Sequence, residues 1–564
     1  MKRIIYILIC MTMLSCSNEL DLGPKALLGD DQVGGADNVD GFVTAAYSSL
    51  GNDHYDHPFS LWPFGNVRSD DAYKGGSGPA DIQDFHFIET FSNVTANFGE
   101  LDALWYNYYI AISRANEALN QLALLSEEEY PEKKVREGEM RFLRGYQYFQ
   151  LKIMFKYIPY IDETVPDSEY ENISNVALSN DELWEKIAAD FQFAIDNLPV
   201  SKTDIGRADK FAAQALLAKT RLYQAYEQDD DNNVTNINTG KLEEVISLAN
   251  EVLNNSPYDL EADFAYNFLP GDYENGKESI FAVQYSTDDG TMHGRLNFGD
   301  VLAVPMGLGC CDFHKPSQNL VNAYKTSADG LPEFDTYNQS NLDFAANNVD
   351  PRIDHTIATP GHMWKYDQNL LYEESWNRSP DVYGVHASLK ENVSPDCPCF
   401  VNIDPFYGNS KNRILVRYAD VMLWKAEALI ELGRQAEALE LINRIRERAQ
   451  ASTELLKFAN GSYMGNYLVE IYVDGVNCNW TQDFARKALR WERRLEFAME
   501  GSRYFDLVRW GIAKETMDKY FMEEKERISY YQGSSVTKGR DEYLPIPQKQ
   551  INFSKGLYQQ NVGY

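Results

Sequence analysis

Apolar side chains recur every three or four positions over long stretches of this chain of 564 residues. The pattern is longest from Leu101 to Leu122, and it returns from Phe142 to Ile153 and from Leu183 to Leu198. This spacing places the apolar side chains on one face of an amphipathic helix. Pro159 and Pro199 follow two of these stretches, where they are expected to end the helices. The chain is therefore predicted to be mainly α-helical.

Other segments predict helices that pack in pairs. Residues 208–226 and 242–253 form one such pair, joined by an acidic loop. A second pair follows from the apolar spacing of Val416–Ile430 and Ala438–Ile445, with Gly433 as a natural stop between them. Small residues in this pair resemble a degenerate tetratricopeptide unit, in which two helices pack closely. The predicted fold class is a set of tetratricopeptide-like helix pairs.

The middle of the chain has a different character. Over residues 261–412, Pro, Gly, Asn, Asp and aromatic residues alternate without a helical period, which is typical of loops that carry function on a rigid scaffold. We expect an N-terminal helical part at 41–260, a loop-rich ligand-binding insert at 261–412 and a C-terminal helical repeat part at 413–515. Residues 516–564 are expected to form a tail that closes on the scaffold.

The N-terminal residues resemble an export signal. Lys2 and Arg3 precede an apolar run from Ile4 to Leu14, which is too short to span a bilayer. The sequence Met13-Leu14-Ser15-Cys16 resembles a bacterial lipoprotein cleavage box. In this interpretation residues 1–15 are a signal peptide, Cys16 is lipidated and residues 16–40 are a tether, so the protein is anchored to a membrane and does not span it. The alternative is an ordinary secretory signal with an incidental cysteine.

Charge and cysteine spacing exclude two classes of function. The net charge of −33 repels phosphate backbones, so no nucleic-acid partner is expected.

The later cysteines are a vicinal pair, Cys310 and Cys311, then Cys397, Cys399 and Cys478, which is not a zinc framework. Outside the cell Cys310 and Cys311 can bond to each other, stay as thiols, or pair with Cys397 and Cys399. If they bond to each other, we expect a flat disulfide surface in the ligand platform.

No catalytic set stands out in the sequence. A nucleophile elbow, a phosphate loop and a His-Glu-x-x-His motif are all absent. Three acidic residues, Glu492, Glu496 and Glu500, lie at helical spacing beside several arginines. They can be interpreted as an active site, but a salt-bridge lattice between packed helices needs fewer assumptions.

Two groups of residues suggest metal binding only weakly. The short segment with His54, Asp56 and His57 has ligating side chains, but it lies among turn residues and is interpreted as a solvated loop. Asp229 begins a partial calcium-loop pattern that lacks the required glycine and the final glutamate. We therefore expect no metal and no cofactor, with a structural calcium ion as a weak alternative.

Aromatic residues are the more informative feature. Five tryptophans fall within helical patterns and are expected in the core, namely Trp105, Trp184, Trp424, Trp491 and Trp510. Four others lie in loops, namely Trp62, Trp364, Trp376 and Trp480. A sugar has apolar C–H faces and polar edges, so an exposed ring beside polar groups suits it well. Local packing is the alternative for each single ring, but the group as a whole favours carbohydrate binding.

Several motifs, taken in order, resemble the SusD/RagB family over nearly the whole mature chain. They are Trp62-Pro63 with Arg68-Ser69-Asp70-Asp71-Ala72-Tyr73-Lys74-Gly75-Gly76, Arg141-Phe142-Leu143-Arg144-Gly145-Tyr146, Arg417-Tyr418-Ala419-Asp420-Val421 with Glu427-Ala428-Leu429, Glu492-Arg493-Arg494-Leu495-Glu496-Phe497 with Phe505-Asp506-Leu507 and Arg509-Trp510, and Leu544-Pro545-Ile546-Pro547. The resemblance implies a surface-exposed, lipid-anchored protein of a Gram-negative outer membrane. It also implies a hinged lid over a SusC-like, TonB-dependent transporter that imports oligosaccharides.

The resemblance also guides the choice of functional residues. The helix motifs of the family are structural, so Arg417, Asp420, Glu427, Arg493 and Asp506 are expected in ion pairs of the scaffold. By position and chemistry, the predicted ligand-binding residues are Trp62, Asp70, Asp71, Tyr73, Cys310, Cys311, Trp364 and Tyr383.

A glycan-binding protein without catalysis is the leading functional hypothesis. It captures an oligosaccharide or polysaccharide and hands it to the transporter. One alternative is a surface glycoside hydrolase, which requires two carboxyl groups about 5–10 Å apart around a sugar cleft. The other is a peptide- or protein-binding uptake component of the RagB type.

Overall fold

The computed structural model describes residues 35–564 except 203, 288 and 291–294. The predicted signal peptide and Cys16 lie outside these residues, as does most of the predicted tether. The main helices are α3 (Val39–Ser48), α4 (Gln83–Thr90), α5 (Gly99–Ala123), α6 (Lys133–Phe155), α7 (Asn180–Asn197), α8 (Lys210–Ala225), α9 (Thr239–Asn255), α13 (Tyr418–Glu431), α14 (Gln435–Ala451), α15 (Gln482–Phe497), α16 (Arg503–Arg509) and α17 (Ala513–Glu524). Four short ones are α10 (Gln318–Ala323), α11 (Ile353–Thr356), α12 (Pro380–Tyr383) and α18 (Gln548–Phe553).

Strands are short and pair mostly in twos. They are β1 (Ala72–Gly75), β2 (Tyr226–Gln228), β3 (Val234–Ile237), β4 (Ser279–Val283), β5 (Phe313–Pro316), β6 (Lys325–Thr326), β7 (Asn348–Val349), β8 (Ile357–Ala358), β9 (Ala387–Ser388), β10 (Phe400–Ile403), β11 (Phe406–Asn409), β12 (Arg413–Arg417) and β13 (Asn466–Tyr467). The pairs are β1–β5, β2–β3, β4–β12, β8–β9 and β10–β11, and β6, β7 and β13 form a three-stranded sheet. The predicted mainly α class is confirmed.

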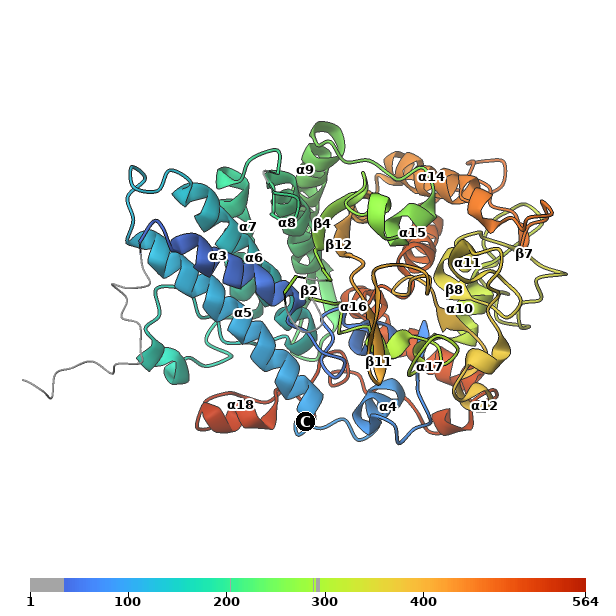
Figure 1. The fold of residues 1–564 in the computed structure, drawn as a ribbon, viewed down its shortest axis with the longest axis horizontal. Helices are drawn as coiled ribbons and strands as arrows, with labels where there is room; N and C mark the ends of the chain where they lie inside the picture. The colour runs from blue at the N-terminus through green and yellow to red at the C-terminus, as the bar shows by residue number, and fades with distance from the viewer. Residues whose placement is uncertain (1–34, 203, 288, 291–294) are drawn as a thin grey trace, which may run out of the picture.

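Neighbouring helices along the chain pack side by side. In the N-terminal part α5 packs on α6, α6 on α7, α7 on α8 and α8 on α9 (Figure 1). Helix α13 then packs on α9 and on its own partner α14, which continues the stack into the C-terminal part. The turn between α13 and α14 contains Gly433 at a φ of +75°, a conformation that glycine adopts without strain. The predicted pairs of tetratricopeptide-like helices are therefore present.

Buried ion pairs hold the C-terminal helices to the rest of the molecule. Glu496 on α15 lies 3.0 Å from Arg352 and 2.9 Å from Arg417, and it also pairs with Arg448. Burial raises the pKa of the Glu496 carboxyl, but the three guanidinium charges outweigh this effect and hold its pKa far below the ordinary value. We call this cluster the central lattice; its members are Glu278, Arg352, Arg417, Arg446, Arg448, Glu492, Glu496 and Glu500. The salt-bridge interpretation of Glu492, Glu496 and Glu500 is confirmed.

Four of the five family-motif residues expected in ion pairs are found in them. Arg417 belongs to the central lattice, Arg493 lies 2.8 Å from Asp506, and Glu427 pairs with Arg509. Asp420 instead accepts a hydrogen bond of 3.0 Å from the backbone N–H of Arg417 at the start of α13. Burial raises the pKa of Asp420 to about 6 despite the cations around it.

A segment near the N-terminus is fixed against the end of α15. Gly501, at a φ of +80°, donates its N–H to Asn66 at 2.7 Å. A side chain on Gly65 would overlap the Gly501 carbonyl oxygen, and one on Gly501 would overlap the carbonyl oxygen of Ser60. Two backbones can approach this closely only because both positions are glycine.

Candidate functional site

Three aromatic rings from distant segments meet on the surface of the molecule. Tyr55 follows α3, Phe298 lies in the middle of the chain, and Phe406 begins β11. The ring centroids are 5.2 Å apart for Tyr55–Phe406, 5.8 Å for Phe298–Phe406 and 6.1 Å for Tyr55–Phe298. All three side chains are half-buried, so part of each ring faces solvent. We call these three residues the aromatic patch.

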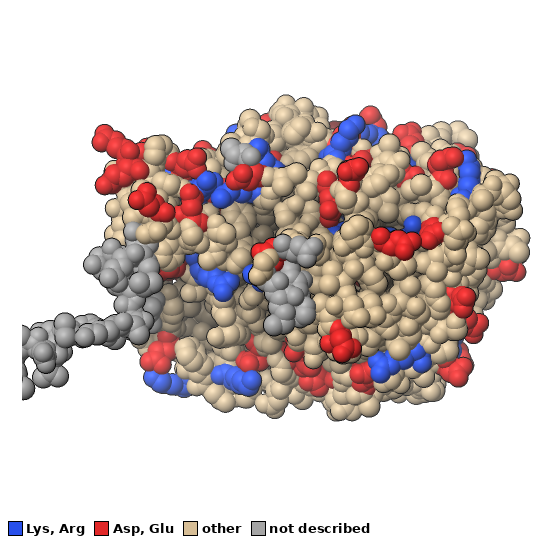
Figure 2. Space-filling model, in the orientation of Figure 1, with Lys and Arg blue, Asp and Glu red and all other residues tan. Residues whose placement is uncertain are grey.

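Polar groups border the aromatic patch. The loop that carries Tyr55 also presents His54, Asp56 and His57, all partly exposed. On the hairpin of β10 and β11, Tyr407 stacks on Phe400 at 5.3 Å and accepts a hydrogen bond from the exposed Asn402 at 3.2 Å. On the face shown in Figure 2, the area around β11 is largely free of charged side chains. Rings beside amide, imidazole and carboxylate groups are what a sugar requires.

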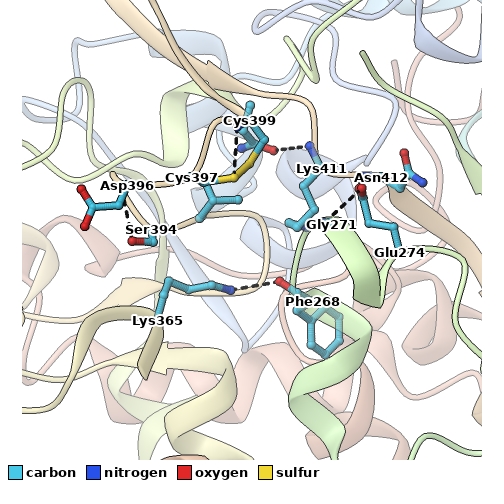
Figure 3. The surroundings of a disulfide bond; sticks show 12 residues. Phe268, Gly271, Glu274, Lys365, Ser394, Asp396, Cys397, Cys399, Lys411 and Asn412 are labelled. Carbon is cyan, nitrogen blue, oxygen red and sulfur yellow. Dashed lines mark hydrogen bonds between the residues drawn. A yellow bond between two sulfur atoms is a disulfide. The ribbon is translucent and has the colours of Figure 1, made fainter. Parts of the chain in front are cut away.

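The β10–β11 hairpin is held at its base. A disulfide joins Cys397 to Cys399, directly before Phe400 (Figure 3). The carbonyl oxygen of Cys399 accepts a hydrogen bond from the backbone N–H of Ser410 at 3.0 Å. Below it, the ammonium group of Lys365 donates to the carbonyl oxygen of Phe268 at 3.1 Å. Burial lowers the pKa of Lys365 to about 7. The disulfide and the hydrogen bond between Cys399 and Ser410 therefore hold the base of the hairpin.

A cavity of about 150 Å³ lies next to the segments that carry the patch. Ser60, Trp62, Asn297, Asp300 and Arg413 are among its lining residues. Ser60 donates to Asp300 at 2.5 Å, and Asn297 donates to the other oxygen of Asp300 at 2.7 Å. The chain around Tyr55 and the chain around Phe298 are thus joined beneath the patch.

Among the predicted ligand-binding residues, the tryptophans are buried. Trp62 is 1% exposed, and its indole N–H donates to the carbonyl oxygen of Gly299 at 3.3 Å, although the ring does line the cavity. Trp364 is fully buried and donates to the carbonyl oxygen of Val393 at 3.0 Å. The expectation that these two rings form an exposed platform is wrong. The loops of the insert fold over one another and make a second apolar core, whose members are Ala358, Trp364, Tyr372, Trp376, Ala387 and Leu389.

The predicted acids and tyrosines are buried as well. Asp70 and Asp71 pair with Arg494 on α15, and Asp70 also pairs with Arg503 at 2.8 Å. Burial raises the pKa of Asp70, but the two arginines outweigh it and lower the pKa to about 2. Both acids are therefore buried and neutralise arginines.

Tyr73 and Tyr383 each contact a charged side chain. The Tyr73 hydroxyl donates to Glu524 at 2.7 Å, and the Tyr383 ring lies 5.6 Å from the Lys74 ammonium nitrogen. Both tyrosines are buried, so the expected exposed role is wrong for them too.

The vicinal cysteines bond to each other. Cys310 is half-buried and Cys311 is buried. Gly309 before them packs directly on the Tyr407 ring, which leaves no room there for a side chain. The disulfide therefore adjoins the β10–β11 hairpin, and its part in ligand binding stays a prediction. Cys478 is a free thiol.

Reasoning from the sequence missed the three residues of the aromatic patch. Tyr55, Phe298 and Phe406 lie in aperiodic segments, and no local pattern separates an exposed ring there from a buried one. The only available signal was that each lies beside turn-forming residues, as in Asp53–Pro58 and Asp404-Pro405.

Comparison with known proteins gives two family matches. The model described as the SusD family matches residues 277–564, and the model described as "Starch-binding associating with outer membrane" matches residues 70–222. SusD-like protein P2 of Formosa agariphila is 24% identical over 572 residues, which cover 100% of this chain and 99% of the relative.

Solved structures share the fold. A SusD-like protein from Bacteroides fragilis aligns with a TM-score of 0.70 at 21% identity, covering 96% of this chain and 100% of that one. A structure described as a laminarin-binding SusD-like protein aligns with a TM-score of 0.68 at 21% identity, covering 94% and 100%. No helix among the described residues is long and apolar enough to cross a bilayer.

Proposed function

Since the chain belongs to the SusD family, we propose that it binds glycans at the outer membrane and passes them, chemically unchanged, to a SusC-like TonB-dependent transporter. The observation that carries this proposal is the aromatic patch. Its three partly exposed rings lie within about 6 Å of one another and have polar groups at their edges. Rings held in this way bind the apolar face of a sugar with little loss of side-chain entropy.

The relatives support a carbohydrate as cargo. One structural neighbour is described as laminarin-binding, and another was solved with a xylogluco-oligosaccharide. We extend this class of ligand to the present chain. The net charge of −33 repels polyanions, so we expect a neutral glycan to bind better than a sulfated or uronate-rich one of similar length.

Attachment to the membrane is part of the proposal. The signal at residues 1–15 and Cys16 suit an acyl anchor, and the family description names association with the outer membrane. In cells fed with an alkyne-labelled fatty acid, we expect the label on the wild-type protein and not on the Cys16→Ser variant. A soluble, unlabelled wild-type protein would contradict the anchor but not glycan binding.

The binding step is tested with purified protein and a panel of neutral polysaccharides in affinity electrophoresis. We expect retardation by at least one glycan, with a dissociation constant in the micromolar to millimolar range, about −8 to −4 kcal/mol, because the cargo must leave again. Reducing ends are measured in the same incubations. Release of new reducing ends by the protein alone would replace the proposal with glycoside hydrolysis, and failure to bind any glycan while a peptide library is retained would favour peptide uptake.

A further inference from the structure

Three metal-ligating side chains converge in the loop that carries Tyr55. The Nδ1 atom of His54 lies 2.6 Å from Oδ1 of Asp56, and the Nδ1 atom of His57 lies 2.7 Å from the same oxygen. Among the described residues, this is the only group of three or more His, Cys, Asp or Glu side chains whose ligand atoms all lie within 4.8 Å of one another. The sequence interpretation of this segment as a solvated loop did not anticipate that both imidazoles point at one carboxylate.

The loop holds these side chains in place. His57 donates its backbone N–H to the carbonyl oxygen of His54 at 3.1 Å, which closes a tight turn. Asn107 on α5 lies 3.2 Å from Nε2 of His57, on the side of the ring away from Asp56. The His54 ring packs against Phe298 with centroids 4.9 Å apart. Contacts behind the rings, which fix the direction of the ligating atoms, are typical of metal sites.

The chemistry of the donors selects the class of ion. Two imidazole nitrogens and one carboxylate oxygen suit zinc and neighbouring transition metals, whereas calcium and magnesium prefer oxygen ligands only. Ligand atoms on a tetrahedral zinc ion, with bonds of about 2.0–2.1 Å, lie roughly 3.3 Å apart. The observed spacings of 2.6 and 2.7 Å therefore need the Asp56 oxygen to move by about 0.6 Å.

Solvent access permits both this movement and the entry of an ion. The side chains of His54 and Asp56 are each 39% exposed, while His57 is 13% exposed. We propose that His54, Asp56 and His57 form a surface site for a zinc-class divalent ion, next to the aromatic patch. Three protein ligands leave a further coordination position open to water or to a hydroxyl group of a ligand.

The proposal is tested by titrating ZnCl₂ into metal-free protein in isothermal calorimetry. We expect one saturable site in the wild type, and an affinity at least about tenfold weaker in His54→Ala, His57→Ala and Asp56→Asn, since even the loss of an outer contact costs about 10–100-fold. The matched control is His86→Gln. His86 is also a partly buried histidine near a carboxylate, Glu89 at 3.6 Å, but it lies outside the cluster. This variant should bind zinc as the wild type does.

A spectroscopic readout locates the ion independently of the affinities. Co²⁺ bound to two imidazoles and a carboxylate should give visible absorption bands in the wild type and in His86→Gln, and the bands should be lost in Asp56→Asn. Circular dichroism checks that each variant is folded. Absence of a saturable zinc site in the folded wild type, or equal zinc affinity in all four variants, would overturn the proposal. Either result leaves the glycan-binding proposal untouched, because affinity electrophoresis tests that proposal separately and without added zinc.

Discussion

The central lattice and the aromatic patch reverse the usual placement of charge and apolar surface. In the lattice, the carboxylates and guanidinium groups are buried except for that of Glu500, whose side chain is 21% exposed, and Glu496 by itself contacts three arginines. In the patch, Tyr55, Phe298 and Phe406 keep part of their rings in solvent. Buried ion pairs carry a desolvation cost, and their directional contacts fix the elements that meet there. The comparison shows that the charged residues of the family motifs stabilise the helical scaffold. The candidate site, in contrast, is formed by aromatic rings that lie outside those motifs.

Removal of one lattice carboxylate should have the largest effect. Glu496→Ala leaves Arg352, Arg417 and Arg448 with buried charge that is no longer compensated, which should lower the free energy of unfolding by about 3–5 kcal/mol. Guanidinium unfolding followed by fluorescence measures this. Glu437→Ala is the control, because Glu437 pairs with Arg434 on the surface and should change stability by less than about 1 kcal/mol. Equal stability of the two variants would show that the lattice is not a structural centre.

Trp364→Ala separates the buried tryptophans from the patch. Since Trp364 is packed in the second apolar core against Tyr372 and Trp376, its removal should cost about 3–5 kcal/mol of stability. The same unfolding assay applies, and glycan retention is measured below the unfolding transition. A variant that keeps its stability but loses glycan binding would show that Trp364 contacts the glycan.

Truncation of a patch ring should weaken glycan binding while lowering stability less than Trp364→Ala does, because the patch rings are only half-buried. In Phe406→Ala and Tyr55→Ala we expect glycan affinity to fall by about 5–30-fold, which corresponds to about 1–2 kcal/mol of lost ring contact. Calorimetry with the best glycan of the panel measures the affinity. Tyr106→Ala, at an exposed position on α5 outside the patch, is the matched control and should bind normally. Unchanged affinity in both patch variants would place the glycan elsewhere on the molecule.

The smallest expected effect is a pH dependence of stability that arises from Asp420, a residue beside the central lattice. Burial raises the pKa of Asp420 to about 6, so the folded protein holds a proton that the unfolded chain releases above its ordinary pKa near 3.8. The folded state therefore loses stability from this group as the pH rises from about 4 to about 6. Asp420→Asn keeps the oxygen that accepts the Arg417 N–H and should have a melting temperature that declines less over this range. Asp259→Asn, at an exposed position, should follow the wild-type curve.

Periodicity predicted the scaffold well because it reports which face of a helix is buried. The helices expected around 101–122 and 142–153 appear as α5 and α6, and the arginines and glutamates of the motifs are paired as expected. In the loops this reasoning failed, since a tryptophan such as Trp364 has no helical period to show which way it faces. The patch could not be predicted because its rings come from three distant segments that meet only in the folded chain.

The contact between Gly65 and Gly501 joins two segments that are synthesised far apart in time. Residues 60–72 lie early in the chain, but three of the groups that fix them, Arg494, Gly501 and Arg503, emerge hundreds of residues later. During synthesis this early stretch can contact Gly299 and Asp300 first, but its docking place is completed only when the last eighth of the polypeptide has arrived. A stop codon placed shortly before residue 494 should therefore leave a buried segment that is encoded near the beginning of the message without its ion-pair partners.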